Sequence, residues 1–342
     1  MTDASINNAV YEPQFFHREA RRKLVVKAVF FIFILSLIEG PLRKWILPGL
    51  SGPLTLLRDP FVLALYAYCI SKGMIWKRGI AQLWLGFATI TVLLGLVQYA
   101  VNGFGLTGWM LGVRTYWLYM PLAFVVARTF TRDDIHRFLK MNLWIAIPYA
   151  ILVARQYNAP PLAIINWGVG AAYDVVGLSD SIVRPYGLFT YTGPNVQFTT
   201  AMIAMFVAFY VGAVRVRFPT MFLVASGAAV GSMSVLTGSR GIYFLGGLIL
   251  IVTVAGILFS RPTGRNLKRI LGIFGFVCLA GLMFLFVFPD MLDAMLGRFD
   301  RAAAIEGSIW NRAFDGFFVW IDPLFTAPAF GAGIGAGAPG VA

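Results

Sequence analysis

Hydrophobic residues gather into long, nearly uninterrupted runs along the chain, and polar residues are concentrated in the segments between them. A helix needs about 20 apolar residues to cross the roughly 30 Å hydrocarbon core of a bilayer, and the runs at 24–39, 80–101 and 270–289 have about that length. The chain does not show the alternation of apolar and polar positions that is typical of membrane barrels. The pattern therefore predicts an all-α, polytopic transmembrane helical bundle.

The apolar runs predict about nine spans, and these divide the chain into three parts. The spans are expected at 24–40, 55–71, 80–101, 114–129, 140–155, 196–214, 218–237, 241–260 and 270–289. They make up a bundle over 24–289, which follows a basic cytoplasmic segment at 1–23. An outer loop at 156–195 joins the fifth and sixth spans. The last part, 290–342, is expected to hold a periplasmic interfacial helix and a Gly/Ala-rich end.

The composition agrees with a membrane protein and accounts for the charge. Hydrophobic residues make up 59% of the chain and charged residues 13%, a balance too apolar for a soluble domain of 342 residues. A net charge of +13 on a soluble protein would suggest nucleic acid. Here most of the Lys and Arg residues fall in alternate segments between spans, as expected for cytoplasmic segments. We therefore expect a cytoplasmic amino terminus, membrane lipids as neighbours and no nucleic-acid partner.

The remaining basic residues lie at or beyond the opposite, outer face of the membrane. All but one of them are arginines, whereas the inner segments mix arginine with lysine. Membrane topology does not distinguish the two residue types, but bidentate recognition of phosphate favours arginine. The outer face is therefore predicted to bind anions. The outer set is Arg43, Lys44, Arg58, Arg114, Arg155, Arg184, Arg240, Arg298, Arg301 and Arg312.

Arg184 and Arg240 are the strongest candidates within the outer set. Arg184 lies near the end of the outer loop, and Arg240 lies where the eighth span begins, so both are expected beside the positive ends of helices. Two guanidinium groups there would hold a diphosphate and neutralise charge on it as a leaving group. Two plainer interpretations stay open: Arg240 as an interfacial anchor of its helix, and Arg184 as the ion-pair partner of Asp174 or Asp180.

Other polar pairs in the outer segments have structural interpretations. Glu39 and Arg43 are spaced for an i to i+4 ion pair, and Arg58 adjoins Asp59, so both pairs are expected to close an outer hairpin. The aromatic residues in and just before the fourth span are expected to form an ordinary interfacial belt. These are Trp109, Tyr116, Trp117 and Tyr119.

Several kinds of chemistry find no support in the sequence. The histidines, His17 and His136, lie in predicted inner segments, so no histidine serves the outer face. No phosphate-binding loop or dinucleotide fingerprint occurs. Cys69 and Cys278 lie far apart inside apolar runs and are interpreted as packing residues. We expect neither a metal nor another cofactor.

Two pairs of motifs resemble those of a known family. "RPYGLFTYTGPN" before one span and "LTGSRG" opening another resemble the paired signature of the bacterial O-antigen ligase and O-antigen polymerase superfamily. "EGPLRKWILP" followed by "LLRDP" resembles the start of a branch of polysaccharide polymerase-like inner-membrane proteins. The resemblance extends through "NRAFDGFF" and "FGAGIGAG" and so covers nearly the whole chain.

The resemblance implies a bacterial inner-membrane glycosyltransferase of the lipid-donor, GT-C type. Such enzymes transfer a glycan from undecaprenyl diphosphate to a hydroxyl acceptor at the periplasmic face, in O-antigen, lipopolysaccharide or exopolysaccharide biosynthesis. The acceptor is a second glycan or the lipid A core, and polysaccharide assembly proteins are possible partners. Arg184 and Arg240 would be the catalytic pair that binds the donor diphosphate. Substrate-binding roles are expected for Arg114, Arg312, Asn195 and Ser239.

The chain departs from the ligase pattern at its carboxy-terminal end. Family ligases carry a further outer histidine in a large loop, followed by closing helices, and this chain ends before such a residue. We therefore favour a polymerase or a chain that lacks the carboxy-terminal part. Two other functions stay open: a transporter or flippase for lipid-linked or anionic glycans, and a non-catalytic subunit of a polysaccharide export complex.

Overall fold

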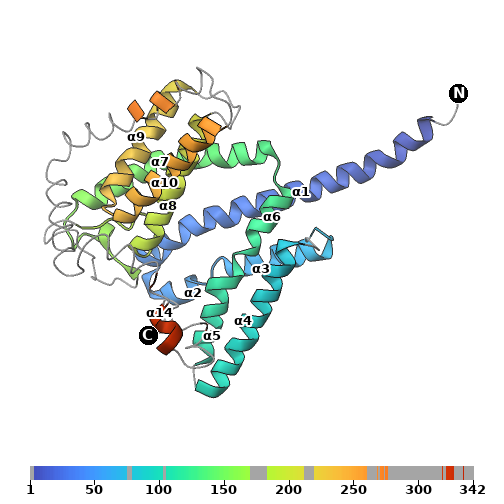
Figure 1. Cartoon of the computed structure of the whole chain (residues 1–342), viewed down its shortest axis with the longest axis horizontal. Helices are drawn as coiled ribbons and strands as arrows, with labels where there is room; N and C mark the ends of the chain where they lie inside the picture. The colour runs from blue at the N-terminus through green and yellow to red at the C-terminus, as the bar shows by residue number, and fades with distance from the viewer. Residues whose placement is uncertain are drawn as a thin grey trace. The chain divides into compact units, whose positions relative to one another are not determined.

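The computed structural model describes five long stretches of the chain and a few short pieces. The stretches are 4–74, 79–102, 105–169, 183–211 and 219–259, and the pieces are 268, 270–272, 274–275, 318, 321–326 and 334. The regular elements of these residues are helices, and no strand occurs among them (Figure 1). The prediction of an all-α chain is confirmed for this part of the protein.

Six of the described helices are long and apolar enough to cross a membrane. They coincide with six of the predicted spans and comprise Arg18–Ile46, Pro48–Ser71, Ile80–Val101, Leu106–Thr129, Arg132–Asn158 and Arg240–Phe259. Two more predicted spans correspond to helices outside that set, α8 (Thr192–Tyr210) and the shorter apolar helix α9 (Thr220–Leu236). The ninth, 270–289, lies almost entirely outside the described residues. The structure therefore supports a helical membrane protein with six candidate spans, and the count of nine stays a prediction.

The chain divides into two compact units, and α1 (Ala4–Pro41) passes from the first into the second. The first unit contains Met1–Phe33, Arg58–Thr131 and Glu306–Ala342. Its further described elements are α3 (Asp59–Ser71), α4 (Ile80–Asn102), α5 (Leu106–Val113), the π-helical turn η3 (Arg114–Leu118), α6 (Pro121–Thr129) and α14 (Ile321–Thr326).

The core of the first unit is built by α1, α3 and α6. It contains Val25, Ile32, Val62, Leu65, Cys69 and Val125. Cys69 is buried within it, which confirms its expected packing role. Cys278 lies outside the described residues.

The second unit contains Ile34–Leu57 and Arg132–Ile305. After α1, its described elements are the π-helical turn η1 (Leu42–Ile46), η2 (Pro48–Leu50), α2 (Ser51–Leu54), α7 (Arg132–Asn158), η4 (Ile164–Asn166), α8, α9 and α10 (Arg240–Phe259). Helix α7 packs against α8 and α9, and α8 also packs against α10 (Figure 1). Their core contains Tyr149, Val153, Met202, Met233 and Leu236, and it supports the candidate site described next.

Candidate functional site

The turn between α9 and α10 places Arg240 at a helix amino terminus. Helix α9 ends at Leu236, and Gly238 follows with a φ of 60°, the left-handed conformation that commonly terminates helices. Ser239 is buried, and Arg240 begins α10 and is half-buried. The prediction that a helix begins at Arg240 is thus confirmed, and this residue lies next to backbone amides that favour an anion.

Arg184 lies in a buried segment, 183–189, that precedes α8. Val183 and Tyr186 are buried on either side of it, whereas Arg184 is only half-buried. Along the chain, α8 begins several residues after Arg184, at Thr192. Asn195 on the first turn of this helix donates to the carbonyl of Pro185, the residue after Arg184, and the expectation that Arg184 lies beside a helix amino terminus stays a prediction. Pro194 lies in the first turn of this helix, where proline is well tolerated.

Asn195 connects the Arg184 segment with the Arg240 turn. Its side chain is completely buried, and its Nδ2 donates a hydrogen bond of 2.8 Å to the Pro185 carbonyl. The same Nδ2 lies 3.5 Å from Thr237 Oγ1, at the limit of a hydrogen bond. The Tyr149 hydroxyl donates to Asn195 Oδ1. One amide on the first turn of α8 therefore contacts the residue after Arg184 and a residue of the turn that leads to Arg240.

A second group of polar contacts surrounds Gly187 in the same segment. Gln156 Oε1 accepts a hydrogen bond of 2.8 Å from Gly187 N, and Gln156 Nε2 donates one of 3.1 Å to Gly187 O. Lys44 Nζ donates a further bond of 2.9 Å to the same carbonyl. Gly187 has a φ of 60°, and a Cβ there would lie 1.9 Å from the Tyr149 hydroxyl oxygen. Only glycine fits this conformation and this close approach.

The structure brings together residues that sequence reasoning had not connected. The sequence alone places Lys44 in the outer basic set without a role, and it does not point to Tyr149 or Gln156. The "RPYG" motif ends at the glycine these residues surround, and a glycine within a motif is the signal that could have pointed to such contacts. Their partners lie 31 to 143 residues apart along the chain, a pairing that spacing does not reveal.

The expected substrate-binding residues have different surroundings. Asn195 and Ser239 lie in the segments just described, but both are buried, and the described partners of Asn195 are protein groups. A positioning role suits Asn195 better than direct contact with substrate. Arg114 belongs to the first unit, where its Nε donates to Asp59 Oδ2 at 2.6 Å. Arg312 lies outside the described residues.

The predicted pairs turned out differently from each other. Arg43 pairs with Glu39 at 3.3 Å, which confirms the i to i+4 interaction. Asp59 does not pair with its neighbour Arg58 but with Arg114, and it also accepts a hydrogen bond from Tyr119. Arg58 instead lies over the Tyr119 ring, 5.0 Å from its centre. Tyr119 is therefore part of a polar cluster as well as of the expected aromatic belt.

An apolar cavity of about 500 Å³ lies between α8, α9 and α10. Its α10 wall starts at Ile242, two residues after Arg240, and continues to Leu250. Because an α-helix rises about 1.5 Å per residue, this wall extends to about 15 Å from Arg240 along the helix axis. Other lining residues include Ile203, Phe206, Leu223 and Val230. A half-buried cation therefore begins the helix that forms one wall of a hydrocarbon-lined cavity.

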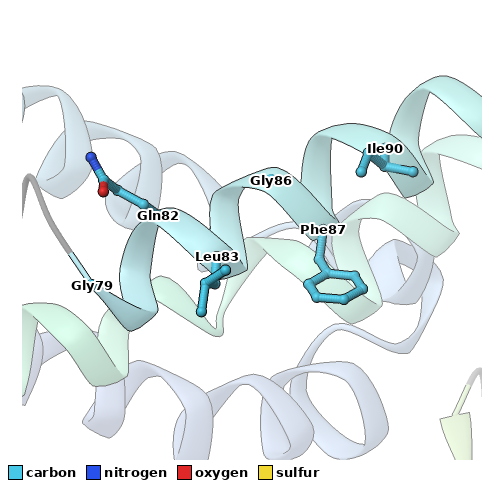
Figure 2. Close-up of a pocket in the computed structure, with 6 residues that line it drawn as sticks. All are labelled: Gly79, Gln82, Leu83, Gly86, Phe87 and Ile90. Carbon is cyan, nitrogen blue, oxygen red and sulfur yellow. The ribbon is translucent and has the colours of Figure 1, made fainter.

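A second hollow follows one face of α4 in the first unit. Figure 2 shows Leu83 and Phe87 pointing to the same side of this helix, with Gly86 between them. Its remaining lining residues are Gly79, Gln82 and Ile90, so it contains no charged side chain. On a helix apolar enough to span a membrane, such a face suits contact with lipid rather than chemistry.

Among the residues the structure describes, no group of three His, Cys, Asp or Glu side chains is arranged to hold a metal ion. The described helices support a helical membrane protein in which Asn195 links the Arg184 segment to the turn before Arg240, and an apolar cavity borders α10. No protein-family model matches the chain, and neither a curated protein nor a solved structure matches it.

Proposed function

We propose that the protein transfers glycans from undecaprenyl diphosphate to a hydroxyl acceptor at the periplasmic face of the bacterial inner membrane. It would act as a polymerase or ligase in O-antigen or exopolysaccharide biosynthesis. The motif resemblance suggests this activity, and the geometry of the second unit supports it. The observation that carries the proposal is that Asn195 contacts both the Arg184 segment and the Arg240 turn.

In this proposal the two arginines act on the donor diphosphate. The acceptor oxygen attacks the anomeric carbon of the donor sugar, and the bond from that carbon to the diphosphate oxygen breaks. The electron pair leaves with the diphosphate, and the acceptor proton passes to a base that is not assigned. The guanidinium groups of Arg184 and Arg240 would stabilise the charge that grows on the leaving diphosphate. The cavity between α8, α9 and α10 would receive the first isoprene units of the carrier.

Arg240→Lys tests the proposal, since lysine keeps the charge but loses the planar, bidentate donor geometry. The variant and the wild type are expressed in a host that lacks its own copy of the gene, and surface glycan is analysed by gel. We expect Arg240→Lys to insert normally and to yield no polymer or ligated glycan. Arg137→Lys, at an exposed arginine of α7 that is not in the outer basic set, is the matched control and should yield wild-type product.

Normal product from Arg240→Lys would refute the role of Arg240. If deletion of the gene changes neither the chain length of the surface glycan nor its attachment, the proposed activity is refuted. Loss of chain length on deletion would indicate a polymerase, and loss of attachment would indicate a ligase.

A further inference from the structure

Lys44 is a completely buried cation at the end of the first membrane-crossing helix. It lies on the π-helical turn η1 with an exposed fraction of 0%. Its Nζ donates to the Gly187 carbonyl at 2.9 Å and lies 4.4 Å from the centre of the Trp45 ring and 6.0 Å from that of Tyr186. Among the described residues, no carboxylate is within ion-pair distance of it.

These partners compensate a buried ammonium only in part. An ammonium has three donors, and one carbonyl and two ring faces supply less than a full negative charge. Removing a charge from water without a counter-ion is costly, and well-packed apolar substitutes for buried charges are often neutral or stabilising. Packing alone therefore does not explain why a lysine occupies this position.

The carbonyl that Lys44 binds belongs to the segment that carries Arg184. Gly187 follows Arg184 by three positions and adopts the left-handed conformation. The end of α1 also packs directly on this segment, because a Cβ on Gly40 would lie 1.8 Å from the Leu188 carbonyl oxygen. The only other side chain found to donate to Gly187 O among the described residues is that of Gln156. Lys44 thus donates the charged hydrogen bond to this carbonyl from the turn that follows α1, whereas Gln156 binds the same carbonyl from α7.

We propose that Lys44 is a positioning residue whose bond to the Gly187 carbonyl holds segment 183–189 in the conformation in which Arg184 binds an anionic diphosphate. The proposal rests on the proposed function, because the diphosphate is its substrate group. Lys44 itself does not touch the substrate in this account. It acts through the backbone of the segment, so its effect should depend on Arg184.

Lys44→Met separates this role from packing, because methionine is similar in length but has neither charge nor donor. The variant is purified in detergent, and its melting temperature and the hydrogen exchange of peptides covering 183–189 are measured. We expect melting at or above the wild-type temperature together with faster exchange in this segment. Lys72→Met, at an exposed lysine that follows α3, is the control and should change neither quantity.

Binding of geranylgeranyl diphosphate tests the link to Arg184. Lys44→Met should weaken this binding about tenfold in the wild-type background. In an Arg184→Gln background the same substitution should cause little further loss, because residues that act through one another are not additive. Equal losses in both backgrounds, or wild-type exchange across 183–189 in Lys44→Met, would overturn the proposal.

Two further results would also decide between the proposal and its alternatives. If Lys44→Met does not fold, Lys44→Arg is measured in its place, because arginine keeps the charge and an N–H donor. Wild-type hydrogen exchange and wild-type affinity in Lys44→Arg would support the proposal. A folded Lys44→Arg with faster exchange across 183–189 would contradict it. If the wild type binds geranylgeranyl diphosphate no better than geranylgeraniol, the proposed function fails, and the diphosphate role of Lys44 fails with it. The exchange measurement then still reports whether Lys44 holds segment 183–189.

Discussion

Replacing Asn195 by alanine should loosen both arginine-bearing segments at once. The substitution removes the donor to the Pro185 carbonyl at 2.8 Å and the acceptor of the Tyr149 hydroxyl, both in a buried environment. It also removes the weak contact with Thr237 at 3.5 Å.

The expected loss follows from the groups left without these partners. A buried donor or acceptor without a partner costs about 1–3 kcal/mol. The Pro185 carbonyl and the Tyr149 hydroxyl together therefore predict a loss of roughly 2–6 kcal/mol in the free energy of unfolding, with little added by the Thr237 contact.

The assay is unfolding of the detergent-purified protein, followed by tryptophan fluorescence. Asn158→Ala is the matched control, because Asn158 is exposed and donates one hydrogen bond of 2.8 Å to the Ala154 carbonyl. This control should change the free energy of unfolding by about 0.5 kcal/mol or less. If Asn195→Ala loses no more stability than Asn158→Ala, Asn195 does not hold the two segments together.

Two further substitutions test the packing of each unit. Gly187→Ala should lower the free energy of unfolding by about 2–4 kcal/mol, because alanine is strained at a φ of 60° and its Cβ would lie 1.9 Å from the Tyr149 hydroxyl oxygen. Gly52→Ala is the control, because a Cβ there meets nothing within 4 Å, and it should be close to neutral in the same unfolding assay. Equal effects of the two substitutions would contradict the reasoning. Asp59→Asn should cost about 1–3 kcal/mol through the loss of the charged bond to Arg114. Glu19→Gln, in a more exposed pair with Arg22, should destabilise the protein less than Asp59→Asn does, and the reverse order would contradict the account.

The sequence was most informative where local pattern decides structure. The apolar runs predicted about nine spans, and six of them coincide with described helices that are long and apolar enough to span a membrane. The "TGSRG" motif predicted that a helix begins at Arg240, as α10 does. The i to i+4 pair of Glu39 and Arg43 was also predicted correctly. Each of these depends on residues that are close along the chain, where helix geometry fixes their relation.

Contacts between distant residues were not predictable in the same way. Asp59 forms its ion pair with Arg114, 55 positions away, and not with the adjacent Arg58, because residues next to each other along a helix do not face each other. The sequence likewise does not predict that Lys44 is completely buried, because an arginine and a lysine at adjacent positions near a predicted helix end suggest an interfacial anchor. Tertiary packing decided both cases.

The central claim is that Arg184 and Arg240 together bind one diphosphate on a polyprenyl chain. It is tested most directly by comparing the affinities of geranylgeranyl diphosphate and geranylgeranyl monophosphate for the wild type, Arg184→Gln and Arg240→Gln. The account predicts that the wild type binds the diphosphate at least about tenfold more tightly, and that either substitution removes this preference. A wild type without the preference, or a preference that persists in both variants, would contradict it.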